Sequence, residues 1–197
     1  MVEEMSIWTR LAAFAEVETE RTILRPFRYQ DVDDFYAIVT NPDNLAFIFP
    51  AQASYEQAEE LLVSLFMTKP LGVWAIEDKA SGSMIGAIRF EKISPTGKKA
   101  DLGYFLHQDY WGQGLMTEIV KGLVFLAFSQ FGMEEIAIVT HLENQASQAV
   151  AKKAGFVLES QYRGSDRYSH RMRDYKRYVI RKSHYSLKEN EEENDHT

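Results

Sequence analysis

Cysteine is absent from this chain of 197 residues. Without a thiol the chain can form no disulfide, no thiolate metal site and no covalent cysteinyl-acyl intermediate. The five histidines are scattered and show no His-x-x-x-His spacing, so we expect no structural or catalytic metal ion. Neither a disulfide framework nor a metal centre is therefore expected to organise the fold.

Long apolar runs are also absent. No run approaches the roughly 18–20 residues that a helix needs to cross a bilayer. Residues 5–16 carry Trp8, Leu11 and Phe14, but Arg10 interrupts them and no cleavage site follows. This pattern predicts a short amphipathic helix rather than a signal peptide. We therefore expect a cytoplasmic protein with no membrane partner.

Charge is unevenly distributed along a chain whose formal net charge is −7. An acidic run at 189–195 predicts a solvated, disordered tail over 186–197. Residues 163–182 are basic and interleaved with tyrosines, a composition that could bind RNA. The alternation there favours instead a pair of strands with one solvated face, so we expect no nucleic-acid partner.

Hydrophobic periodicity predicts one domain with the order β-α-α-β-β-β-α-β-α-β-β. Turn-forming residues at 79–82 and 94–97 separate three strands and predict an antiparallel meander. A long amphipathic helix begins at Gly114, and Gly155 ends a shorter one. The expected strands cover 22–27, 73–77, 84–93, 100–107, 135–141, 156–162 and 175–183, and the other helices begin at 31, 54 and 144.

The segment 109–118, Asp-Tyr-Trp-Gly-Gln-Gly-Leu-Met-Thr-Glu, joins a strand to the long helix through Gly112 and Gly114. Such a turn can present backbone N–H groups to an anion at a helix N-terminus, with no Cβ in the way. The Lys-Ser/Thr of a P-loop and the Gly-x-Gly-x-x-Gly of dinucleotide-binding folds are missing. Taken alone, the segment fits an anion site and a plain helix-opening turn equally well.

Four ordered motifs resemble the GNAT acetyltransferase superfamily, and within it the RimJ/RimL type that acetylates protein N-termini. They are Thr19-Glu-Arg-Thr-Ile-Leu-Arg-Pro26, Leu102-Gly-Tyr-Phe-Leu106, Trp111-Gly-Gln-Gly-Leu-Met116, and Asn144-Gln-Ala-Ser147 with Lys153-Ala-Gly-Phe156. Trp111 and Met116 depart from the family pattern of the loop. The resemblance implies a single α/β (α+β) domain over 19–185, with a mixed, mostly antiparallel sheet flanked by helices. Residues 1–18 would form a helical extension.

The resemblance further implies acetyl-CoA as cosubstrate, with its diphosphate on the glycine turn. A backbone N–H of the strand around 102–105 would polarise the thioester carbonyl. Asn144 would face the cofactor and also cap its helix. The implied cofactor contacts are Leu102, Tyr104, Gln113, Gly114, Leu115, Met116, Thr117 and Asn144.

Acetyl transfer to an amine also requires that the amine lose a proton and that the thiolate leave. The RimL type implies Ser147 and Glu159 as the pair that moves these protons. Asp101, Glu91 and His141 are further candidate bases. Ordinary structural roles stay open for each of them, because Ser147 can cap its own helical turn and Glu159 can be a solvated strand residue.

The leading hypothesis is an N-acetyltransferase whose amine attacks the thioester directly in a ternary complex. A protein N-terminal α-amine is the first expected acceptor, and a small amine such as a polyamine, an aminoglycoside or an amino-acid derivative is the second. A non-catalytic acyl-CoA-binding module and an RNA-associated protein are the competing classes. The loops at 41–53 and 162–173 are expected to line the acceptor groove, and a homodimer through the terminal strands is compatible with the pattern.

Overall fold

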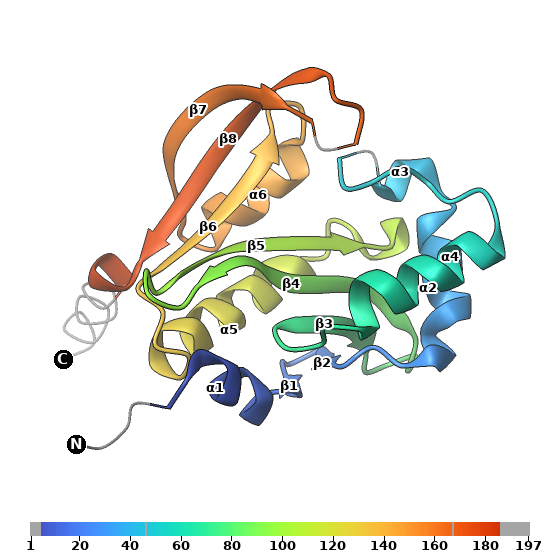
Figure 1. Cartoon of the computed structure of the whole chain (residues 1–197), viewed down its shortest axis with the longest axis horizontal. Helices are drawn as coiled ribbons and strands as arrows, with labels where there is room; N and C mark the ends of the chain where they lie inside the picture. The colour runs from blue at the N-terminus through green and yellow to red at the C-terminus, as the bar shows by residue number, and fades with distance from the viewer. Residues whose placement is uncertain (1–4, 46, 167, 186–197) are drawn as a thin grey trace.

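The computed structural model describes residues 5–45, 47–166 and 168–185, so the acidic tail lies outside the described residues. An eight-stranded sheet runs through the molecule in the order β1-β2-β3-β4-β5-β6-β8-β7 (Figure 1). Its strands are β1 (Val17–Glu18), β2 (Thr22–Arg25), β3 (Val73–Asp78), β4 (Met84–Ser94), β5 (Lys99–Leu106), β6 (Glu135–His141), β7 (Val157–Ser165) and β8 (Met172–Arg181). Every neighbouring pair is antiparallel except β5 and β6. The expected mixed sheet and its meander are confirmed.

Helices cover both faces of the sheet. They are α1 (Ile7–Ala13), α2 (Val32–Val39), α3 (Pro42–Leu45), α4 (Tyr55–Leu61), α5 (Leu115–Ser129) and α6 (Gln145–Lys153), and a π-helical segment, Leu62–Met67, continues α4. One apolar cluster packs α5 and α6 on one face, and a second packs α2 and α4 on the other. Short 3-10 turns, Tyr29–Asp31 and Gln108–Tyr110, precede α2 and follow β5. Within the described ranges, no helix has the length and apolar character needed to cross a membrane.

Two elements are missing from the sequence prediction because they are too short to show a period. β1 has two residues and pairs with β2. α3 has four residues and lies in a stretch whose sequence is typical of a turn. α1 is the amphipathic helix expected at the N-terminus, and its Leu11 is 1% exposed within the cluster under α5. Residues before the first long strand thus contribute to the core.

The pairing between β5 and β6 is short. It covers only Lys99–Asp101 with Glu135–Ala137, and Figure 1 shows β6 rising away from β5 beyond this point. At the end of β5, the N–H of His107 donates to Ile85 of β4, and at its start the carbonyl of Lys98 accepts from Glu134 on the β6 side. Backbone direction alternates along a strand, so the N–H groups of Leu102 and Tyr104 both face the β6 side. The N–H of Leu102 takes part in the last paired step, Asp101 with Ala137, whereas the N–H of Tyr104 points into the opening that β6 has left. A ligand can satisfy such unpaired groups.

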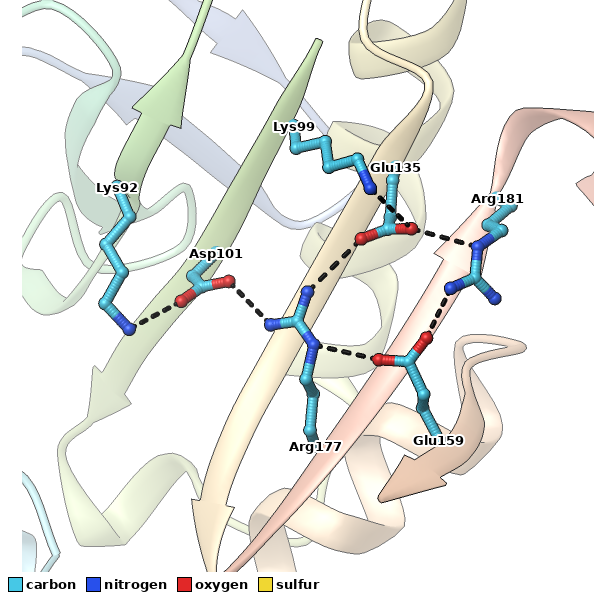
Figure 2. A network of polar contacts seen from close by, with 7 residues as sticks. All are labelled: Lys92, Lys99, Asp101, Glu135, Glu159, Arg177 and Arg181. Carbon is cyan, nitrogen blue, oxygen red and sulfur yellow. Dashed lines mark hydrogen bonds and ion pairs between the residues drawn. The ribbon is translucent and has the colours of Figure 1, made fainter. Parts of the chain in front are cut away.

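A network of charged side chains spans the sheet where β5 and β6 last pair (Figure 2). Arg177 of β8 donates to Asp101 at 3.1 Å, to Glu135 at 3.2 Å and to Glu159 at 3.0 Å. The Glu135 side chain is 8% exposed, so its charge must be paired inside the protein. This network, called the apex network below, therefore links the two halves of the sheet at the point where the opening between β5 and β6 begins. Its other members are Lys92, Lys99 and Arg181.

The β7–β8 hairpin differs from the expected strand pair with one solvated face. Almost every residue of β7 is exposed, including Val157, Leu158 and Tyr162. The expectation is wrong for β7 because it is the outermost strand of the sheet. In β8 the expectation also fails toward the end of the strand, where the consecutive residues Tyr178, Val179 and Ile180 are all buried, so neither face is solvated there.

We predict that Arg177→Met lowers the free energy of unfolding by about 1–3 kcal/mol, because a largely buried Glu135 loses one of its hydrogen-bonded cations. Urea denaturation measures the change. The matched control is Lys79→Met, which removes a surface ion pair to the exposed Glu18 and a hydrogen bond to the carbonyl of Thr19, and should cost about 0–1 kcal/mol. Equal losses in the two variants would contradict a special role for the apex network.

Candidate active site

A cleft of about 910 Å³ passes between β5 and β6 where they diverge. Residues from both faces of the sheet line it, together with the turn before α5, the first turn of α6, the α3 segment and the β7–β8 loop. Most residues singled out from the sequence meet here: Glu91, Asp101, Leu102, Tyr104, Gly114, Leu115, Met116, Thr117, His141, Asn144 and Ser147. Gln113 and Glu159 do not line it.

The turn before α5 has the geometry of an anion site. Gly112 and Gly114 have φ values of 73° and 79°, a backbone conformation that favours glycine. The first helical bond of α5 runs from Glu118 N–H to the carbonyl of Gly114, so the N–H groups of residues 115–117 have no helical partner. Leu115, Met116 and Thr117 line the cleft at the N-terminus of a 15-residue helix, which is the positive end of the helix dipole. A Cβ at Gly112 would meet no atom within 4 Å, which leaves room for a diphosphate.

Both departures from the family pattern of this loop have a structural explanation. The Met116 side chain is buried in the core under α5, so it does not block the turn. The Trp111 indole N–H donates to the carbonyl of Leu106 at 2.7 Å, which fixes the chain where it leaves β5. Met116 is thus accommodated in the core, whereas the half-exposed Trp111 lines the cleft.

Arg21 stabilises this turn and was not identified from the sequence. Its guanidinium donates to the carbonyl of Gln113 at 2.9 Å and to the carboxylate of Glu118 at 2.8 Å. Burial acts to raise the pKa of Glu118, but hydrogen bonds from Thr19 and Arg21 outweigh it and the pKa is lowered. Because Glu118 lies in the first turn of α5, its charge would repel an anion, and Arg21 offsets that charge. Gln113 thus supports the turn through its carbonyl.

Two hydroxyl groups meet at the first turn of α6. Asn144 caps this helix by accepting from the Ser147 N–H at 3.0 Å. The Ser147 and Tyr104 hydroxyl oxygens lie 3.0 Å apart. Burial raises the pKa of Tyr104 to about 12, and the Ser147 hydrogen bond only partly opposes it. Tyr104 therefore keeps its proton at neutral pH and can donate a hydrogen bond or a proton into the cleft.

His141 lies at the end of β6 and lines the cleft. Burial lowers its pKa below the usual value, although the charges of Asp166 and Glu143 act in the opposite direction. The imidazole is therefore neutral at pH 7 and can accept a proton. Asp101 also lines the cleft, but its two oxygens accept from Arg177 and from Lys92.

Glu159 is not brought into the cleft. Its carboxylate accepts from Arg181 and, at 3.0 Å, from Arg177 on the apex network. The Arg181 hydrogen bond, joined by that of Arg177, lowers the pKa of Glu159. The strand order explains this position. Although β7 follows β6 in the sequence, β8 lies between them in the sheet, so Glu159 of β7 is separated from β6 by one strand. Glu159 therefore contacts Arg177 and Arg181 and does not line the cleft.

Comparisons with known proteins agree with this geometry. A family model described as an acetyltransferase (GNAT) domain matches residues 21–157. The uncharacterized N-acetyltransferase YoaA of Bacillus subtilis is 29% identical over 150 residues, 74% of this chain and 85% of that protein. The ribosomal-protein-serine acetyltransferase of Escherichia coli is 32% identical over 76 residues, 39% of this chain and 42% of that protein. A crystal structure of a GNAT-family acetyltransferase from Bacillus anthracis has a TM-score of 0.76 at 17% identity, covering 85% of this chain and 99% of that one.

We predict that Gly114→Val abolishes CoA binding, because a β-branched residue at positive φ distorts the turn that presents the N–H groups. For the wild type, CoA at about 100 times its Kd should stabilise the native state by about 2.7 kcal/mol, which a thermal-shift titration detects.

Gly82→Val is the matched control, since Gly82 also has positive φ, 73°, but lies in the β3–β4 turn with no atom near its Cβ position. Both variants should lose stability without ligand, and only Gly114→Val should lose the response to CoA. A CoA shift retained in Gly114→Val would place the diphosphate elsewhere.

Proposed function

Because this chain belongs to the GNAT acetyltransferase family, as an acetyl-CoA-dependent N-acetyltransferase, we propose that its acceptor is a protein N-terminal α-amine. The observation that carries the proposal is the kind of base that the cleft offers. Asp101 is held by two cations, whereas His141 is neutral and lines the cleft. An imidazole is a weak base, and it suits an α-amine with a pKa of about 7.7–8.0 better than a lysine amine near 10.4.

The name of one relative supports the same acceptor class. The Escherichia coli relative is named for acetylating a serine of a ribosomal protein. This similarity covers only 39% of the chain, so the chemistry of the cleft is the stronger support. Small amines, polyamines among them, are the alternative that the acceptor test must separate.

The residues of the cleft have distinct proposed roles. Acetyl-CoA supplies an activated thioester, and the N–H groups of residues 115–117 would hold its diphosphate. The N–H of Tyr104, pointing into the opening, would stabilise negative charge on the carbonyl oxygen as the amine attacks. His141 would take the proton that the amine gives up. The Ser147–Tyr104 hydroxyl pair would donate to the departing sulfur, a minor contribution because a thiolate with a pKa around 8.5 leaves readily.

Thiol release from acetyl-CoA tests the acceptor. We expect kcat/KM to be highest for peptides with a free N-terminal amine, and no release with N-terminally blocked peptides that carry only lysine amines. With no cysteine in the chain, initial-rate plots should intersect, as direct attack in a ternary complex requires. A higher kcat/KM for spermidine than for every peptide would overturn the proposed acceptor, and parallel plots would overturn direct attack.

His141→Asn tests the base. At pH 7 we expect turnover to fall about 10²-fold, in the range typical of general-base catalysis, with CoA binding unchanged. The loss should shrink above pH 8, where more of the α-amine is already neutral. Because the pKa of His141 is lowered, the wild type should lose its base only below the usual imidazole value of about 6.5.

Glu159→Gln is the matched control for this experiment, and its turnover should stay within about twofold of wild type, since its carboxylate lies outside the cleft. Ser147→Ala should give a milder loss than His141→Asn. If Asp101→Asn is inactive while His141→Asn turns over normally, the base lies on β5 and the assignment of His141 is wrong.

A further inference from the structure

The β7–β8 loop places a carboxylate beside His141. The Asp166 Oδ2 atom lies 3.7 Å from the His141 Nε2 atom, and the two side chains are only 17% and 14% exposed. Both residues line the same cleft. A carboxylate at this distance, shielded from water, favours the protonated form of an imidazole. The pair joins the end of β6 to a loop 25 residues later, so it exists only in the folded chain.

Asp166 is held firmly in place by its own loop. Its Oδ1 atom accepts from the backbone N–H groups of Tyr168 and Ser169 and from the Ser169 hydroxyl, at 3.2, 2.6 and 2.7 Å. The Tyr175 hydroxyl approaches Oδ2 at 3.5 Å. These bonds leave Oδ2 directed toward His141. The same hydrogen bonds, that of the Ser169 hydroxyl first, lower the pKa of Asp166 to about 2, so it is anionic throughout the physiological range.

The His141 ring is itself confined between aromatic neighbours. The Tyr175 ring of β8 lies 4.7 Å from it, and the Phe47 ring, from the segment after α3, lies 5.4 Å away. The α3 segment is fastened to the site by the buried Asn44, which donates to the carbonyl of Ile38 and accepts from the N–H of Gln108. Three separate parts of the chain thus fix the imidazole relative to the carboxylate.

We propose that Asp166 is a positioning residue for the transfer reaction: it orients His141 and stabilises the imidazolium that forms when His141 takes the proton of the acceptor amine. The inference rests on the proposed function, in which His141 is the base. One proton moves from the amine nitrogen to the imidazole, and the charge that it creates is paired with the Asp166 carboxylate. In the resting enzyme burial keeps His141 neutral, and the carboxylate keeps it basic enough to act.

Other charged groups also face His141 and set the size of the effect. Glu143, which follows β6, acts in the same direction as Asp166, and Arg173 of β8 acts against both. Phe47 carries no charge, and the Tyr175 hydroxyl is neutral at physiological pH because burial raises its pKa. Removing Asp166 and removing Arg173 should therefore shift the titration of His141 in opposite directions.

The test combines an NMR titration of the His141 ring with steady-state kinetics on the full chain. Asp166→Asn keeps an oxygen for the loop N–H groups but removes the charge. We expect the pKa of His141 to fall by about one unit or more. Turnover of an N-terminal peptide at pH 7 should fall about 10-fold, less than in His141→Asn. Arg173→Gln should shift the pKa of His141 upward by a smaller amount.

Asp78→Asn is the matched control. Asp78 caps the β3–β4 turn in the same way, accepting from the N–H and hydroxyl of Ser81, and it does not line the cleft. It should change neither the His141 titration nor turnover. An unchanged His141 pKa in Asp166→Asn would overturn the inference, as would a shifted pKa with wild-type turnover. The titration needs neither acetyl-CoA nor acceptor, so its failure is distinguishable from a failure of the proposed function.

Discussion

The early end of the β5–β6 pairing is the constraint on which the rest of the site depends. These are the only parallel neighbours in the described sheet, and only three residues of each strand pair. Because parallel strands run in the same direction, the segments that follow them leave from the same edge of the sheet. The turn before α5 and the first turn of α6 therefore lie on either side of one opening, as their shared cleft shows. A continuous ladder would close this opening and satisfy the N–H groups of β5 internally.

The apex network makes the divergence stable. Glu135, Arg177 and Asp101 come from three neighbouring strands, and their charges are paired where the strands are still close. Beyond them the two halves of the sheet separate, while the apolar clusters under α5 and under α2 pack against its two faces. Polar contacts at the apex and apolar packing on the faces together set the width of the cleft. The same enclosure raises the pKa of Tyr104 and lowers that of His141, so the fold determines which protons the site can give or take.

Features encoded in a few neighbouring residues could be predicted from the sequence. The glycine turn, the helix cap at Asn144 and the meander from β3 to β5 lie close to where their local patterns put them. Contacts between distant segments could not be predicted in this way. The placement of Glu159 follows from β8 inserting between β6 and β7, and no local pattern specifies that order.

Arg21 and Asp166 illustrate the same limit. Arg21 acts on Glu118 across 97 positions of the chain, and its role is invisible until β2 and α5 are placed side by side. Asp166 reads as an ordinary loop residue, and only the hairpin brings its carboxylate to His141. Trp111 and Met116 differ from the family pattern in sequence, yet the fold accommodates both. The Trp111 indole is hydrogen-bonded to Leu106, and Met116 is packed in the core.

Hydrogen–deuterium exchange with and without acetyl-CoA tests most directly whether the opening between β5 and β6 is the cofactor site. We expect slower exchange at the amides of residues 102–106 and 112–117 when acetyl-CoA is present. The amides of β2 and β3, on the far side of the sheet, should exchange at an unchanged rate. Protection confined to a surface outside the cleft, such as the turn between β3 and β4, with no change along β5 or at the start of α5, would contradict this assignment.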